Sequence, residues 1–370
     1  MNLEEKKYSK VSCYDFEIDG NNVFLCDSGK NAIYMIDMET EKGRVIGHFP
    51  TKGFLSKNLS WSMKRVGNNV VFVPFSANHI GVYNLDTNTF SFYEIPIASK
   101  IGKIRYLDEQ KFISVFQYRN RCILLGRTYP GIIIIDIQSG SITVFDDFLK
   151  KVEDDLSIQN SAYFAEGYAQ VGNDVYLGFT CCNSLIKINL DTFEYSLIPI
   201  ECDFEGIGGI CLVDNAIWIT DFSQKGEIII KFDINTGETC KVKMPISDRL
   251  LSPLRQKNIL YFFPFTDIKK MICYDTISGE WDLLKEINSQ FSDDMGRISA
   301  ANIVENDIVG VFDISKKWFK IQDKNISLFD LYIDTEGFLS CLQETGGNII
   351  EEDNDVDFSL FLKLMTDSEK

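Results

Sequence analysis

Histidine is nearly absent from this chain of 370 residues, which has two, and no Cys-x-x-Cys pair occurs among its ten cysteines. Zinc fingers and related structural metal sites need those residue types at short fixed spacings, so the sequence excludes that class. A Gly-rich phosphate loop, a Gly-x-Ser-x-Gly elbow and a His-Glu-x-x-His helix are also absent. The chain therefore shows no recognisable catalytic motif of those three kinds.

Long hydrophobic runs are absent as well. No apolar run reaches the length of a membrane span, and the first seven residues, MNLEEKK, lack the apolar core of a signal peptide. We therefore expect a soluble protein that is not exported by that route. Basic residues are the minority, with 37 Lys and Arg against 54 Asp and Glu and a net charge of -17. Such a charge repels nucleic acid and anionic membranes, which leaves a protein, a peptide or a small molecule as the expected partner.

The ten cysteines are scattered irregularly inside apolar segments. Examples are Cys26, Cys122, Cys211, Cys240 and Cys273. At such places cysteine behaves as a small hydrophobic residue, which is typical of a reducing compartment. The sequence thus predicts a cytoplasmic protein without a disulfide framework.

Short apolar segments are what the chain has in abundance: 45% of its residues are hydrophobic, with 28 Phe and 15 Tyr. In residues 69–96 three such segments, Val70–Val73, Ile80–Leu85 and Phe90–Ile95, are separated by turn residues. Their β-branched and aromatic composition, together with lengths too short for ordinary helices, predicts three strands.

The same pattern recurs along the chain with two markers, an Asn that opens one strand and an Asp that ends the next. The Asn markers are Asn22, Asn69, Asn120, Asn173, Asn215, Asn258 and Asn306, and the Asp markers are Asp37, Asp86, Asp136, Asp191, Asp233, Asp275 and Asp323. Each Asp follows its Asn by 15 to 18 residues, and successive Asn markers are 42 to 53 residues apart. Repeats of this length are typical of propeller blades or solenoid coils.

The repeating units contain strands and no helical apolar stripe, so we predict an all-β fold with one β-propeller of seven four-stranded blades. Its innermost strands are expected to begin near Val11, Trp61, Lys111, Tyr163, Gly206, Leu250 and Arg297. The predicted domain limits are an N-terminal extension at 1–9, the propeller at 10–343, and an acidic tail at 344–370 with a short amphipathic helix at 357–365. For ring closure two segments, 326–333 and 338–342, remain alternatives, and one of them is expected to pair with the N-terminal segment.

Three turns share the sequence pattern Asp-x-x-x-Gly, in which Gly supplies the positive φ that ends the turn. They are Asp136–Gly140, Asp233–Gly237 and Asp275–Gly279. In this respect residues 10 to 335 resemble bacterial kelch-like and other β-propeller repeat proteins, where a strand that ends in Asp leads through a Gly turn to the outermost strand. The chain lacks the repeated Gly-Gly doublets of kelch proteins, and its single Trp281-Asp282 is not the repeated signature of WD proteins. No subfamily is therefore assigned.

Sequence variation among the repeats indicates where a site would lie. The loops between the second and third strands differ from unit to unit, as in Asp27–Gly29, Ser76–His79, Arg127–Tyr129, Thr180–Asn183, Asp221–Ser223, Thr266–Asp267 and Asp313–Ser315. Function is often grafted onto such loops, while the scaffold turns stay uniform. The predicted ligand-binding residues at this mouth of the central channel are Trp61, His79, Arg127, Tyr129, Tyr163, Glu166, Glu205, Asp221, Arg297 and Asp313.

Several features of this face have two interpretations. Glu166 and Glu205 come from neighbouring units and would share a metal ion or form an acid and base pair, or they are ordinary polar residues of a wet channel. The long connections at 97–110 and 146–160 are either a lid or a cover for blade ends, and we favour the cover. The vicinal pair Cys181-Cys182 is interpreted as structural, with a reactive thiolate as the alternative.

The sequence favours a binding or interaction module that recognises a peptide, a protein or a small ligand and needs no cofactor. The alternative is a propeller enzyme similar to the lyases and sugar-lactone hydrolases of this fold, with Glu166, Glu205, Asp221 and His79 around a divalent metal ion. Those families use central histidines or a cage of carboxylates and Asn, and no such motif matches this sequence.

Overall fold

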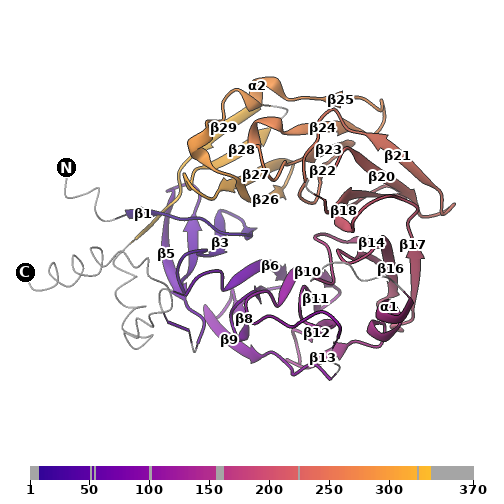
Figure 1. Ribbon diagram of the computed structural model, residues 1–370. Coiled ribbons are helices and arrows are strands. Elements are labelled where there is room, and N and C mark those ends of the chain that lie inside the picture. The colour runs from indigo at the N-terminus through magenta and orange to yellow at the C-terminus, as the bar shows by residue number, and fades with distance from the viewer. Residues whose placement is uncertain are drawn as a thin grey trace, which may run out of the picture.

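The computed structural model describes residues 8–334, apart from 51, 54–55, 100–101, 156–161, 224–225 and 323–324. Six four-stranded sheets and one six-stranded sheet stand around a central axis in these residues (Figure 1). The predicted seven-bladed β-propeller is confirmed. The expected tail and helix at 344–370, the alternative closing strand at 338–342 and the last marker, Asp323, lie outside the described residues.

Each blade is a meander in which the chain starts near the axis and moves outward (Figure 1). Blade 1 contains β2 (Phe16–Asp19), β3 (Asn22–Cys26), β4 (Ile33–Asp37) and β5 (Lys42–Gly47). Blade 2 contains β6 (Ser60–Val66), β7 (Asn69–Pro74), β8 (His79–Asn84) and β9 (Thr89–Glu94), and blade 3 contains β10 (Phe112–Tyr118), β11 (Arg121–Gly126), β12 (Ile132–Asp136) and β13 (Ile142–Phe145). Blade 4 contains β14 (Ala169–Val171), β15 (Asp174–Gly178), β16 (Ser184–Asn189) and β17 (Tyr195–Pro199).

The second half of the ring repeats the arrangement. Blade 5 contains β18 (Ile207–Val213), β19 (Ala216–Asp221), β20 (Ile228–Asp233) and β21 (Thr239–Lys243). Blade 6 contains β22 (Leu254–Gln256), β23 (Ile259–Phe262), β24 (Ile272–Asp275) and β25 (Trp281–Asp282), and blade 7 contains β26 (Ile298–Val304), β27 (Asp307–Phe312), β28 (Trp318–Gln322) and β29 (Asn325–Phe329).

The Asn and Asp markers meet in space, which explains why their separation is nearly constant. The side-chain amide donates to the carboxylate from Asn120 to Asp136 (3.1 Å), from Asn173 to Asp191 (2.9 Å) and from Asn258 to Asp275 (2.9 Å). In blade 2 the donor to Asp86 is Asn68 (2.8 Å), one residue before the expected Asn69. In these four blades the constant spacing therefore corresponds to a hydrogen bond between two turns of one blade.

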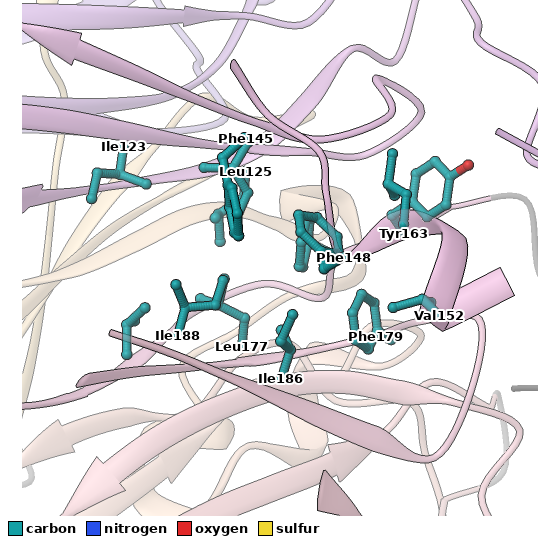
Figure 2. Packing of buried hydrophobic residues seen from close by; sticks show 14 of the residues in the cluster. Ile123, Leu125, Phe145, Phe148, Val152, Tyr163, Leu177, Phe179, Ile186 and Ile188 are labelled. Atoms are coloured by element: carbon teal, nitrogen blue, oxygen red, sulfur yellow. The ribbon is translucent and has the colours of Figure 1, made fainter. Parts of the chain in front are cut away.

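Hydrophobic clusters fill the spaces between neighbouring blades, and Figure 2 shows the one between blades 3 and 4. Helix α1 (Leu149–Asp155) follows blade 3 in the long connection at 146–160, where Phe148, Leu149 and Val152 have helical spacing. All three side chains are buried in this cluster, and Phe148 and Val152 lie near Phe179 of blade 4 (Figure 2). Helix α1 therefore covers the outer part of a blade junction.

The ring closes at the outside of blade 1. Strand β30 (Tyr332–Asp334) lies parallel to β5, and β1 (Tyr8–Lys10) pairs antiparallel with β30, which gives the six-stranded order β1-β30-β5-β4-β3-β2. The predicted closing segment 326–333 therefore reaches the N-terminal segment with its last residues, and its first part forms the outer strand of blade 7. Ile333 is fully buried there, so apolar packing supports the short pairing. In the described part of the chain, no helix is long and apolar enough to cross a membrane.

Candidate functional site

A cavity of about 1060 Å³ occupies the centre of the ring. It extends from Tyr14 and Arg297, beside the variable loops, to Gly20 and Glu305, in the turns at the opposite end of the innermost strands. The cavity thus opens toward both faces, and the two mouths carry different side chains.

One backbone hydrogen bond recurs in the blades and builds the variable mouth. A residue one to three positions after the second strand donates its N–H to a carbonyl in the connection that precedes the blade. The pairs are Phe75 to Leu59 (2.8 Å), Arg127 to Lys111 (2.8 Å), Thr180 to Tyr163 (2.8 Å), Phe222 to Gly206 (2.9 Å), Phe265 to Arg249 (2.7 Å) and Asp313 to Arg297 (2.9 Å). This bond holds the variable loops and the connections at one end of the channel, while the side chains at the two positions change from blade to blade.

Blades 5 to 7 place a stack of alternating aromatic rings and guanidinium groups at this mouth. The Arg249 guanidinium lies 4.2 Å from the ring centroid of Phe222 and 4.9 Å from that of Phe265. The Arg297 guanidinium lies 4.8 Å from the ring centroid of Phe265 and forms an ion pair with Asp313 at 3.3 Å. Aromatic faces attract cations and hold a planar guanidinium in one orientation.

Blades 1 and 2 contribute an aromatic stack to the same mouth. Trp61 lies between Tyr14 and Phe75, with ring centroids 4.4 and 4.6 Å away. Burial raises the pKa of the Tyr14 hydroxyl, and the nearby Asp313 carboxylate raises it further. Tyr14 thus lies close to blade 7, so the aromatic stack and the cationic stack adjoin across the junction where the ring closes.

Glu166 reaches the cavity because the chain bends sharply at the start of blade 4. Gly167 has a φ of +80°, and a Cβ there would collide with the carbonyl of Ile210 and the hydroxyl of Ser252. The carbonyl of Glu166 accepts a hydrogen bond from the N–H of Ile210 (3.1 Å), which fixes the bend against blade 5. Only glycine combines this φ with such a close approach.

Glu166 and two arginines shift each other's protonation equilibria. Burial raises the pKa of the Glu166 carboxyl, and the positive charges of Arg127 and Arg249 lower it in part. Burial also lowers the pKa of both guanidinium groups, against the opposing effect of Glu166. Among the described residues, no carboxylate lies within ion-pairing distance of either arginine; Arg127 instead donates to the side chain of Gln110 (3.1 Å).

Half of the ten predicted ligand-binding residues line the cavity: Trp61, Arg127, Glu166, Arg297 and Asp313. The other half lie elsewhere in the fold. Tyr129 and Tyr163 are buried, and their hydroxyls donate to the Pro96 carbonyl (3.0 Å) and to the Glu153 carboxylate (2.8 Å). Both tyrosines thus tie the long connections to the blades.

The remaining three of the predicted residues do not line the cavity. Glu205 is exposed. Asp221 accepts hydrogen bonds from the backbone (3.0 Å) and hydroxyl (2.5 Å) of Ser223 within its own loop. His79 begins β8, the third strand of blade 2, and its Nδ1 is buried with no hydrogen-bond partner among the described residues. The structure therefore does not bring Glu166, Glu205, Asp221 and His79 together.

Sequence reasoning misses three residues of the mouth, Tyr14, Arg249 and Phe265. A signal for two of them exists, because Arg249 and Phe265 occupy the positions in blade 6 that Arg297 and Asp313 occupy in blade 7. Tyr14 gives no such signal, because the sequence predicts an innermost strand from Val11, and Tyr14 would be an ordinary residue within that strand. In the structure that strand begins at Phe16, and Tyr14 lies in the connection before it.

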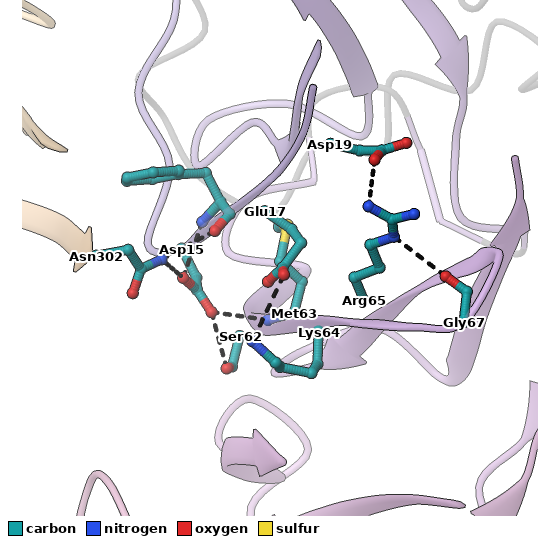
Figure 3. A network of polar contacts seen from close by, with 10 residues as sticks. Asp15, Glu17, Asp19, Ser62, Met63, Lys64, Arg65, Gly67 and Asn302 are labelled. Carbon is teal, nitrogen blue, oxygen red and sulfur yellow. Dashed lines mark hydrogen bonds and ion pairs between the residues drawn. The ribbon is translucent and has the colours of Figure 1, made fainter. Parts of the chain in front are cut away.

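Deeper in the channel, charged side chains are neutralised by neighbours (Figure 3). Lys64 forms an ion pair with Glu17 at 3.5 Å, and Arg65 pairs with Asp19 near the opposite mouth. Asp15 accepts hydrogen bonds from side chains or backbone of blades 1, 2 and 7. These contacts hold the innermost strands together.

No protein-family model matches the sequence, and no curated protein does either. Solved structures do match the fold. Virginiamycin B lyase from Staphylococcus aureus superposes with a TM-score of 0.61 at 14% identity, covering 83% of this chain and 96% of the lyase. A catalytically inactive variant of that lyase with quinupristin gives a TM-score of 0.62 at 15% identity, with 86% and 97% covered. These likenesses establish a shared fold. A chain of the mitotic checkpoint complex matches with a TM-score of 0.59 at 10% identity, covering 88% of this chain and 91% of that one.

Proposed function

We propose that this protein is a binding module that holds a peptide, a protein segment or a small molecule at the variable mouth of its channel. One observation carries the proposal: a backbone hydrogen bond repeated from blade to blade presents different side chains, and those of blades 3, 6 and 7 converge on one cavity with Tyr14, Trp61 and Glu166. Closing the ring of blades does not require aromatic rings, guanidinium groups and a half-buried carboxylate at the variable mouth of the channel. The kelch-like resemblance of the turns is in keeping with an interaction role.

The alternative is an enzyme, and one observation favours it. Glu166 is a carboxyl group whose pKa burial raises, in a cavity, beside two cations, and such groups often act as general acids or bases. The structural neighbours include lyases, which makes an enzyme on this fold plausible as an analogy of fold only. If the enzyme used a metal ion, Glu166 would be the only one of the two predicted metal-binding glutamates, Glu166 and Glu205, that lines the cavity. The described residues contain no group of three or more His, Cys, Asp or Glu side chains suited to a metal ion.

Trp61 provides a reporter for the test. Of the four tryptophans, Trp218 and Trp318 are buried in the blades and Trp281 does not line the cavity, so a ligand at the mouth acts mainly on Trp61 fluorescence. The protein would be dialysed against fractions of a deproteinised cell extract, and the retained compounds would be identified by mass spectrometry. We expect a retained compound to change the fluorescence of the wild type and not that of a Trp61→Phe variant.

The same dialysis separates the two functions. A compound recovered unchanged after prolonged incubation supports the binding module. A compound converted by the wild type, with conversion lost in Glu166→Gln, contradicts it and supports the enzyme. A retained compound that leaves Trp61 fluorescence unchanged and binds a Phe265→Leu variant equally well contradicts the location of the site.

A further inference from the structure

The basic side chains that line the channel are matched in ion pairs with carboxylates except at one place. Lys64 is paired with Glu17, Arg297 with Asp313, and Lys320 with Asp307 at 2.7 Å. Arg255, at the opposite mouth, pairs with Asp214 at 2.9 Å. Two guanidinium groups, on Arg127 and Arg249, remain with one carboxylate, Glu166, at the variable mouth.

This local excess of positive charge is notable in a chain with a net charge of -17. The field of the whole protein repels anions, so an unmatched pair of arginines in a recess is not a by-product of a basic composition. Arg127 comes from the exit of β11 in blade 3 and Arg249 from the connection into blade 6, with Glu166 of blade 4 influencing both. The two cations thus converge from separate blades.

Arg249 is also held ready for a ligand. Its guanidinium lies between the rings of Phe222 and Phe265, and among the described residues it has no hydrogen-bond acceptor. Stacking fixes the plane of the group and leaves its N–H donors free at the edge. A side chain that is already immobilised loses little entropy when it binds, which favours affinity.

Partial burial makes it more favourable for Arg127 and Arg249 to bind an anion. The guanidinium groups of Arg127 and Arg249 have lost part of their hydration without gaining an ion pair in return, as their lowered pKa values indicate. Charge-assisted hydrogen bonds from arginine to a carboxylate or phosphate are short, strong and frequently bidentate. A ligand oxyanion would therefore satisfy donors that this chain leaves open.

We infer that Arg127 and Arg249 form an oxyanion subsite, and that the ligand of the proposed binding module is a molecule with a carboxylate or phosphate group attached to an aromatic or apolar body. The inference rests on the proposed function, because it specifies the ligand of the same mouth. The body of the ligand would lie toward Tyr14 and Trp61, on the side where the mouth is aromatic. A nucleic acid or an anionic membrane is excluded by the overall charge and by the recessed position of the two arginines.

The test uses titration calorimetry with three probes that share a phenyl group: 3-phenylpropionate, phenyl phosphate and the uncharged 3-phenylpropanamide. We expect the anions to bind more tightly than the amide, and the preferred anion identifies the source as a carboxylate or a phosphate. Arg249→Gln and Arg127→Gln should each weaken the preferred anion by about tenfold or more, the change expected for loss of one charge-assisted interaction. Arg249→Lys, which keeps the charge and loses the planar fork, should fall between these values.

Arg255→Gln is the matched control, since Arg255 follows Arg249 in the same segment and lies at the opposite mouth. It should leave the affinity of the anions unchanged, and unchanged melting temperatures would show that every variant is folded. If the amide binds as tightly as the acid, and Trp61→Leu weakens both, the mouth binds ligands without an oxyanion subsite; the inference then fails and the proposed function stands. Absence of binding by both anions, or equal binding to wild type and Arg249→Gln, also overturns the inference.

Discussion

The side-chain amide of Asn302, in blade 7, donates a 2.7 Å hydrogen bond to the carboxylate of Asp15, in the connection into blade 1. The same carboxylate accepts from its neighbour Phe16 (2.8 Å) and from two groups of blade 2, the Ser62 hydroxyl (2.9 Å) and the Met63 N–H (2.8 Å) (Figure 3). One carboxylate therefore joins the last blade to the first two. It closes the ring on the inside, as β1 and β30 close it on the outside.

Removing this carboxylate should destabilise the protein strongly. In an Asp15→Ala variant, four uncharged donors in the channel wall lose their acceptor, and a donor left unsatisfied costs about 1–3 kcal/mol. We expect a decrease of that size in the free energy of unfolding, measured by urea denaturation. Asp214→Ala is the control, because Asp214 is an exposed partner of Arg255, and exposed ion pairs contribute about 1 kcal/mol or less. Equal losses in the two variants would contradict the closing role of Asp15.

Phe148, the residue before helix α1, should contribute strongly to stability. This side chain is fully buried, with ring centroids of Phe145 and Phe164 at 5.3 and 5.7 Å. Replacing it with alanine should cost about 3–5 kcal/mol, as is usual for a large aromatic residue in a packed core. Lys150→Ala, on the exposed side of the same helix, should change stability by about 0.5 kcal/mol or less. A Phe148→Ala variant as stable as the wild type would mean that α1 is not packed as part of the core.

The blade architecture could be predicted from the sequence because the same pattern of strands and turns recurs along the chain. The separation of markers such as Asn120 and Asp136 reflects a hydrogen bond that recurs in four blades, and a single error is corrected by the other copies. In blade 2 the sequence offers two adjacent asparagines, Asn68 and Asn69, and only the structure shows which of them bonds Asp86. Local ambiguity of one residue therefore leaves the fold prediction intact.

The site could be predicted only in part, because it occurs once and its members come from different blades. Trp61 and Arg297 follow from the expected starts of the innermost strands. Arg249 is not predicted as a site residue, because the predicted strand of blade 6 begins one residue later, at Leu250. In the structure β22 begins at Leu254. Glu205 lies beside Gly206 in sequence, yet it is exposed, because the strand period alone does not determine which side of a connecting segment faces the channel.

The rate at which a cysteine reacts with a thiol reagent should be lower for a buried cysteine than for an exposed one. Cys240 is exposed, whereas Cys26 and Cys122 are buried, and burial raises their pKa values well above the ordinary range. Cys211 is half-buried, and burial raises its pKa to about 11. Only the thiolate reacts rapidly with an aromatic disulfide reagent, so at neutral pH Cys240 should react before the other three. Cys240→Ser should remove this fast contribution, and fast reaction of Cys26 in the native protein would contradict the buried blade interior.

The affinity of the mouth for an anion should rise as the pH falls from neutral. The pKa of Glu166 is raised from its usual value, so the carboxyl takes up a proton before an ordinary glutamate does. Protonation removes a negative charge beside Arg127 and Arg249, which stay charged throughout, and Asp15 is the other carboxylate that acts on Glu166. Lowering the pH through the raised pKa therefore increases the net positive charge that faces the ligand.

Phenylmethanesulfonate is a suitable probe for this effect, because it remains an anion over the whole range and its own titration cannot produce the change. In the wild type its affinity, measured by calorimetry, should increase on acidification and level off below the pKa of Glu166. Glu166→Gln lacks the titrating charge, so this variant should bind the probe more tightly at neutral pH and with an affinity independent of pH. A pH dependence that persists unchanged in Glu166→Gln would assign it to another group, and Asp15 would then be the carboxylate to test, since the described histidines, His48 and His79, do not line the cavity.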